Sequence, residues 1–200
     1  MMSYTKIQKL VGTALLTALV IVIQLFGSGL RVGPVAISLV LVPIVVGAVT
    51  YGPAVGAFLG GVFGFVVIGM ILGGLDPASM LMMQFNAPAT VITCLVKGIL
   101  AGFIPALIYK AVRKKNAKFA TILAAALAPI MNTGFYALMV TFVFTGLMEK
   151  SYKIHGTGAV FFTLMAMIIT NFITELITTV VISPIILFAL KKANGARLNK

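Results

Sequence analysis

Long apolar runs, separated by short polar or basic breaks, are the feature that most limits how this chain can fold. The first run extends from Leu10 to Phe26 without a charged residue. About 20 consecutive apolar residues are enough to cross the hydrocarbon core of a bilayer as a helix. Hydrophobic residues make up 61% of the 200 residues, whereas soluble domains are about 45–50% apolar. We therefore predict an all-α membrane protein with one domain over residues 1–200.

The breaks between the apolar runs predict a bundle of six transmembrane helices. Glycine, proline or charged residues mark each break, as expected where a helix ends. Residues 73–86 are expected to be a polar connection, and residues 146–158 a hydrophilic loop. The expected helices run from Lys6 to Phe26, from Val35 to Thr50, from Pro53 to the Gly73-Gly74 pair, from Ala87 to Val112, from the basic cluster near Lys118 to Leu147, and from Ala159 to Leu190.

Small residues recur every four positions in two of these helices. Gly52, Gly56, Gly60 and Gly64 stand four apart and share one face of the expected third helix. Ala14 and Ala18 share one face of the first. Small residues at this spacing let two helices approach closely in lipid, so both faces are predicted to be packing surfaces.

The basic residues are concentrated on one side of the predicted bundle. The formal net charge is +12, with 15 Lys and Arg against three Asp and Glu. Most of the cations flank the termini and the break near residues 110–118. Cytoplasmic loops carry an excess of Lys and Arg, so both termini are predicted to be cytoplasmic. No stripe of aromatic and basic residues suggests a nucleic acid partner.

A few polar residues interrupt the apolar runs at membrane depth. A charged side chain at the centre of a membrane helix costs about 2.5–3.5 kcal/mol on insertion scales and normally faces a partner, a cavity or a ligand. We predict that these residues line one polar pocket, which Arg31 and Gln84 close at its outer mouth. The alternative is that Lys97 and Glu175 only neutralise each other. The candidate binding residues are Arg31, Gln84, Asn86, Lys97, Asn132, Tyr136, Asn171 and Glu175.

The sequence offers little for catalysis. Its three acids lie in three different segments, and Cys94 is its single cysteine. No nucleotide-binding, nucleophile-elbow or zinc-protease motif occurs. We therefore expect no enzyme activity, no metal site and no cofactor.

In its arrangement of helices the chain resembles the substrate-binding S components of energy-coupling factor (ECF) vitamin transporters. The resemblance rests on the six predicted helices, the cytoplasmic termini, the Ala14–Ala18 pair and the stretch VPIVVGAVTYGPAVGAFLGGVFG from Val42 to Gly64. It implies a subunit of a bacterial cytoplasmic membrane that captures a vitamin outside the cell. It also implies docking through Ala14 and Ala18 onto a transmembrane coupling subunit, with two cytoplasmic ATPases driving import.

The resemblance also bears on which vitamin the chain would bind. The stretch QFNAPATVITCLVKGILAGFIPALIYK, from Gln84 to Lys110, is most similar to pantothenate-specific members. Pantothenate carries a carboxylate, hydroxyls and an amide, which would suit a lysine and asparagines. Folate, riboflavin and hydroxymethylpyrimidine are alternatives. Two other functions stay open: an ion-coupled carrier that works alone, with Lys97 and Glu175 as its relay, and a purely structural subunit.

Overall fold

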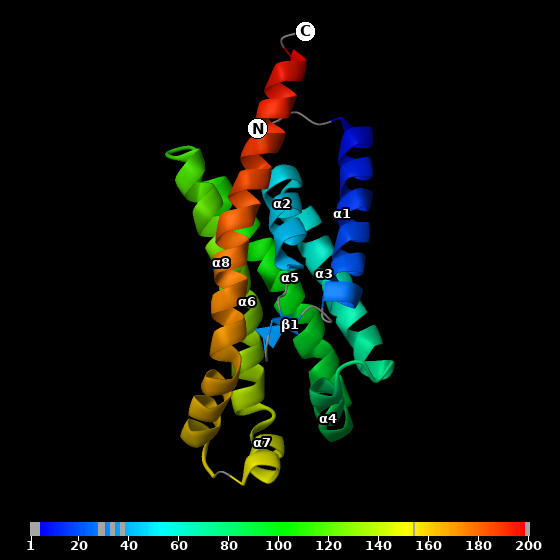
Figure 1. Ribbon diagram of the computed structural model, residues 1–200, viewed down its shortest axis with the longest axis vertical. Coiled ribbons are helices and arrows are strands. Elements are labelled where there is room, and N and C mark those ends of the chain that lie inside the picture. Colours follow the sequence, from blue (N-terminus) through cyan, green and yellow to red (C-terminus); the bar gives the residue numbers. More distant parts are fainter. Residues whose placement is uncertain (1–4, 28–30, 33–34, 37–38, 154, 199–200) are drawn as a thin grey trace.

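The described part of the chain is a bundle of helices that run along the long axis of the molecule (Figure 1). The computed structural model describes residues 5–27, 31–32, 35–36, 39–153 and 155–198, without the side chains of residues 31–32, 35–36, 152 and 193–198. Its elements are α1 (Lys6–Gly27), β1 (Arg31–Val32), β2 (Val35–Ala36), α2 (Leu41–Tyr51), α3 (Pro53–Leu72), α4 (Pro77–Phe85), α5 (Ala87–Val112), α6 (Ala117–Phe142), α7 (Thr145–Tyr152) and α8 (Thr157–Leu198).

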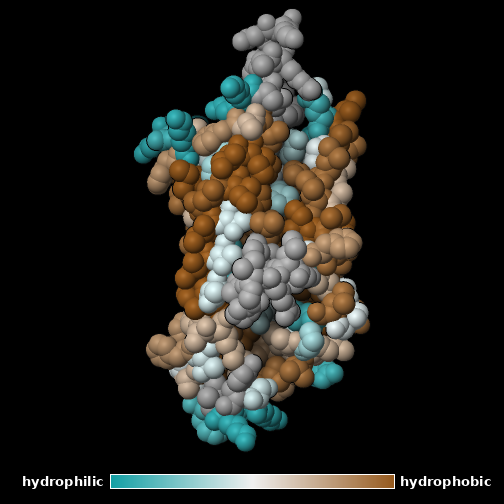
Figure 2. Space-filling model, viewed as in Figure 1, coloured by the Kyte–Doolittle hydropathy of each residue, from teal (hydrophilic) through white to brown (hydrophobic). Residues whose placement is uncertain are grey.

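Within the described residues, five helices are long and apolar enough to cross a membrane: α1, α3, α5, α6 and α8. Figure 2 shows hydrophobic side chains over the middle of the molecule and hydrophilic ones toward both ends. This distribution matches a bilayer, whose apolar core lies between two polar surfaces. The prediction of a helical membrane protein therefore agrees with the structure in helix content. Six transmembrane helices were predicted; the described residues contain five long apolar helices and one shorter apolar helix, α2.

The second helix is shorter than predicted. It begins at Leu41 rather than Val35, because Val35–Ala36 form β2, which pairs with β1 in an antiparallel hairpin. Pro43 therefore lies in the first turn of α2, where its missing N–H leaves no hydrogen bond unmade. The 11 residues of α2 span about 16 Å, roughly half of a hydrocarbon core. Residues 41–48 are all buried, so the apolar character of this segment reflects packing inside the protein rather than contact with lipid.

Two short helices replace segments that were expected to be a connection and a loop. Asp76 caps α4, since its Oδ1 accepts a hydrogen bond of 3.1 Å from the backbone N–H of Ser79. The helix that was expected to reach Leu147 instead ends at Phe142, and α7 follows it. The reason is that Phe144, which lies between the two helices, is fully buried and turns the chain inward.

The expected close packing on the glycine face of α3 is confirmed, and its partner is α5. A Cβ atom added to Gly56, Gly60 or Gly64 would meet backbone atoms of α5, whereas Gly52 precedes α3 and makes no such approach. For example, a Cβ at Gly64 would lie 2.6 Å from the carbonyl oxygen of Cys94. We call this contact the glycine seam; its pairs are Gly56 with Gly102, Gly60 with Gly98, and Gly64 with Cys94.

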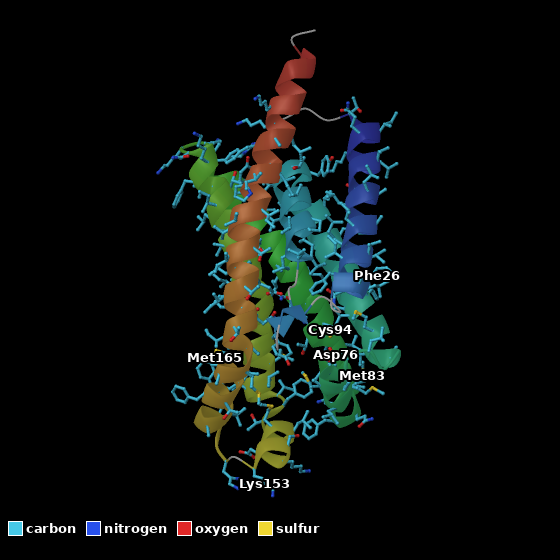
Figure 3. The ribbon with its side chains drawn as sticks, in the orientation of Figure 1. Phe26, Asp76, Met83, Cys94, Lys153 and Met165 are labelled. Atoms are coloured by element: carbon cyan, nitrogen blue, oxygen red, sulfur yellow. The ribbon has the colours of Figure 1, made fainter. Side chains whose placement is uncertain are left out.

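The two ends of the bundle differ in charge. The start of α1, the turn between α5 and α6, and the last turns of α8 lie at one end of the molecule (Figure 1). We call it the basic end, since it carries the basic clusters of these three segments. Helices α4 and α7 lie at the opposite end, with Lys153 at its tip (Figure 3).

Candidate functional site

A cavity of about 360 Å³ lies inside the bundle, in the half farther from the basic end. Residues of α1, α3, α4, α5, α6 and α8 line it, so helices far apart in the sequence meet there. We call it the central cavity. Five of the eight predicted binding residues line it: Lys97, Asn132, Tyr136, Asn171 and Glu175.

Two aromatic rings hold the amine of Lys97 at the cavity wall. Its Nζ lies 5.3 Å from the ring centroid of Tyr136 on α6 and 5.6 Å from that of Phe63 on α3. Cations within about 6 Å of an aromatic ring are attracted to its negative face. The two rings thus help to position the ammonium at the wall of the cavity.

Glu175 is the buried acid of the cavity, with 4% of its surface exposed. Its Oε2 accepts a hydrogen bond of 3.4 Å from the Thr133 hydroxyl of α6. Asn171 precedes Glu175 by one turn of α8 and therefore lies on the same face. Contact between α6 and α8 in this region brings their polar groups to one wall.

The two asparagines leave hydrogen-bonding capacity unused. The Oδ1 atoms of Asn132 and Asn171 are buried and have no hydrogen-bond partner among the described residues. A buried acceptor without a donor costs about 1–3 kcal/mol. Both side chains line the central cavity, so a bound molecule with hydroxyl or N–H groups would satisfy them there. The asparagines are therefore the strongest structural sign of a polar ligand.

Four polar lining residues were missed by sequence reasoning, and one of them is Thr133 on α6. Asp76 and Ser79 enter from the start of α4, and Gln24 from the last turns of α1. Gln24 donates its Nε2–H to the Met70 sulfur at 3.5 Å. The order Asp-Pro-x-Ser is a signal for a helix start that could have revealed α4. The position of α4 against the cavity depends on tertiary packing, which this local signal does not reveal.

The other three predicted binding residues are placed differently. Gln84 is exposed on α4. Asn86 caps α5, where its Oδ1 accepts a hydrogen bond of 3.1 Å from the backbone N–H of Ala89. Neither is among the described lining residues of the central cavity. The side chain of Arg31 lies outside the described residues, and its backbone forms part of β1.

Helix α1 carries the predicted docking residues on an open face. Ala14 and Ala18 are both exposed there, beside large apolar side chains such as Leu15, which is 64% exposed. Only 11% of the apolar window of α1 is buried, against 28–50% for the other long helices. Its outward face is therefore free to contact lipid or another protein within the membrane.

A comparison with protein families identifies a family for this chain. The family model described as the substrate-specific component of ECF transporters matches residues 8–187. The matched range runs from the first turns of α1 to the late part of α8 and includes every residue that lines the central cavity. A search of curated protein sequences gives no match.

Proposed function

The chain belongs to the family of substrate-specific components of ECF transporters, and from this premise we propose that it binds its vitamin in the central cavity. The observation that carries the proposal is the pair of unsatisfied amide oxygens of Asn132 and Asn171, beside the ammonium of Lys97. The cavity volume of about 360 Å³ lies within the range of roughly 300–1,000 Å³ that is typical of small-molecule sites.

We propose pantothenate as the vitamin. Its carboxylate would bind the ammonium of Lys97, and its hydroxyl and amide N–H groups would donate to the two asparagine oxygens. Asp76 and Glu175 add further acceptors for donors of the ligand. A ligand with one anionic end and several donors therefore complements this set of side chains.

Calorimetric titration of the purified chain against a panel of vitamins tests both proposals: that the chain binds a vitamin, and that this vitamin is pantothenate. The panel contains pantothenate, folate, riboflavin and hydroxymethylpyrimidine. We expect pantothenate to give saturable heat with one site per chain. If another vitamin binds and pantothenate does not, the choice of vitamin is wrong and the vitamin-binding class stands. If none binds, a vitamin site in the central cavity is wrong.

The proposed role is binding and not catalysis. The subunit would dock through Ala14 and Ala18 on α1 onto a transmembrane coupling subunit, and two ATPases would drive import. The basic end would face the cytoplasm of a bacterial cell, with both termini. The short helix α2, together with the hairpin before it, would complete a sixth crossing.

One observation favours a second function, an ion-coupled carrier that works alone. Lys97, Asp76 and Glu175 place three ionisable groups in one cavity, and ionisable groups within membrane segments commonly mark proton or ion paths. Uptake into vesicles that contain only this chain and a proton gradient would establish the carrier. Uptake that requires added coupling and ATPase subunits would exclude it.

A further inference from the structure

A second cavity, of about 380 Å³, opens at the basic end and is separate from the central cavity. The last residues of α2, the α5–α6 turn and the late part of α8 form its walls. Three cations line it: Arg113, Lys114 and Lys191. We call it the basic cavity. From its charge and shape, we propose that it binds the phosphate group of a phosphate ester.

Charge balance is the first argument. The whole chain has three acidic residues, and none of them lies at the basic cavity. Asp76 and Glu175 line the central cavity, and Glu149 belongs to α7 at the opposite end. No acidic side chain therefore lies beside the three cations in the described lining of this cavity, which leaves their positive charge available to an anion. The positive-inside rule explains cations at this end, but it does not require them to line a hollow.

The donor groups are the second argument. Arg113 is half-buried at the end of α5, and guanidinium groups match phosphate oxygens with paired N–H donors. Thr50 and Tyr109 add hydroxyl groups to the wall. The Oγ1 of Thr50 is buried and has no hydrogen-bond partner among the described residues. Ala117, the first residue of α6, also lines the cavity, so the positive end of the α6 dipole faces it.

The remaining wall is apolar. Leu187 and Phe188 of α8 line the same cavity, and Ile185 on the preceding turn is 62% exposed. An apolar wall beside a phosphate-binding group suits a phosphate ester with a hydrocarbon part, of which a phospholipid head group is one source. A soluble phosphate ester is the other source. Anionic lipids are concentrated in the cytoplasmic leaflet, where they attract Lys and Arg side chains near the membrane surface.

Native mass spectrometry of the full chain tests the proposal. The chain is released from bilayers that contain phosphatidylglycerol and phosphatidylcholine, and the bound lipids are counted. In a second arm, the chain in phosphatidylcholine nanodiscs is titrated with glycerol phosphate. The pocket variant is Arg113→Gln with Lys191→Gln. The matched control is Lys115→Gln with Lys118→Gln, which removes two exposed charges from the same end outside the basic cavity.

We expect the affinity of the pocket variant for phosphatidylglycerol to be about tenfold lower than that of the wild type. The control variant should bind this lipid as the wild type does. If glycerol phosphate binds saturably, and only the pocket variant loses this binding, the ligand of the basic cavity is a soluble phosphate ester instead of a lipid. Equal losses in both variants, or no selective binding in either arm, would overturn the proposal. If the double variant does not fold, Lys191→Gln alone is compared with Lys118→Gln. Unchanged vitamin binding in the pocket variant separates this result from the central cavity.

Discussion

Lys97 is the one cation among the described residues that line the central cavity. Lys97→Met keeps an apolar stem and removes the charge. We expect the affinity for an acidic vitamin to fall by about 1.5–3 kcal/mol, or roughly 10- to 100-fold, because a hydrogen bond to a charged group is lost. Calorimetry measures the change. Lys115→Met, at an exposed position of the basic end, is the control. Equal affinities of wild type and Lys97→Met would remove Lys97 from the site.

Asn132 separates a binding role from a structural one. Asn132→Leu replaces an amide whose buried oxygen has no partner among the described residues. The unfolding free energy should stay level or rise by about 1 kcal/mol, because an unsatisfied polar group is removed. The vitamin affinity should fall, since the ligand loses an acceptor. Thermal unfolding and calorimetry on the same sample check both. A large loss of stability with unchanged affinity would assign Asn132 to packing alone.

At the residue scale, sequence reasoning works where a side chain is conspicuous against its surroundings. Lys97, Asn132, Asn171 and Glu175 interrupt apolar runs, and the structure brings all four to one cavity. Asp76 was missed because an acid in a polar connection between helices looks ordinary. It reaches the cavity only through the packing of α4 against α3 and α5, a contact that no local pattern encodes.

At the scale of the elements, the glycine seam sets the distance between α3 and α5. In Gly60→Ala the new methyl group would meet the backbone carbonyl of Gly98, which cannot rotate away as a side chain can. We expect a loss of about 1–3 kcal/mol in unfolding free energy, as is typical of overpacking. Gly61→Ala is the matched control, because its Cβ would lie 3.8 Å from the Ile99 side chain, an ordinary contact. Similar thermal unfolding of the two variants would contradict a tight seam.

The presence of the helices was predicted better than the residues at which they begin and end. The reason is that some helix ends are set by local caps and others by tertiary packing. The start of α5 follows from a local signal, the Asn86 cap. The start of α2 does not, because residues from Val35 onward are as apolar as those inside the helix. The end of α6 depends on the burial of Phe144 against α7 and α8, which is a tertiary contact. Local patterns therefore locate a capped end better than an end that packing decides.

At the scale of the whole molecule, the exposed face of α1 predicts how the subunit joins its partners. Ala14→Leu and Ala18→Leu would place bulky side chains where close helix approach requires small ones. We expect these variants to lose co-purification with the coupling subunit while their vitamin affinity is unchanged. Ala166→Leu, at an exposed position of α8, is the control. Loss of vitamin binding in the α1 variants would show that α1 shapes the site as well.

Orientation is also a property of the whole molecule, and thiol labelling of intact cells measures it. Cys94 is buried and is the single cysteine, so a Cys94→Ser background adds little disturbance. With the basic end in the cytoplasm, Lys153→Cys should react with an impermeant reagent in intact cells, and Lys115→Cys only after lysis. The reverse pattern would invert the proposed topology.

The glycine seam also gives the central cavity one fixed wall and one adaptable wall. Lys97 is the neighbour of Gly98 and is therefore anchored where two backbones touch. Gln24 belongs to the sparsely buried α1, so its position can shift at small energetic expense. If the vitamin binds as proposed, analogues altered at the end that contacts Lys97 should be rejected. Analogues altered at the end near α1 should be tolerated, which makes that end the place to attach a label or an inhibitor group.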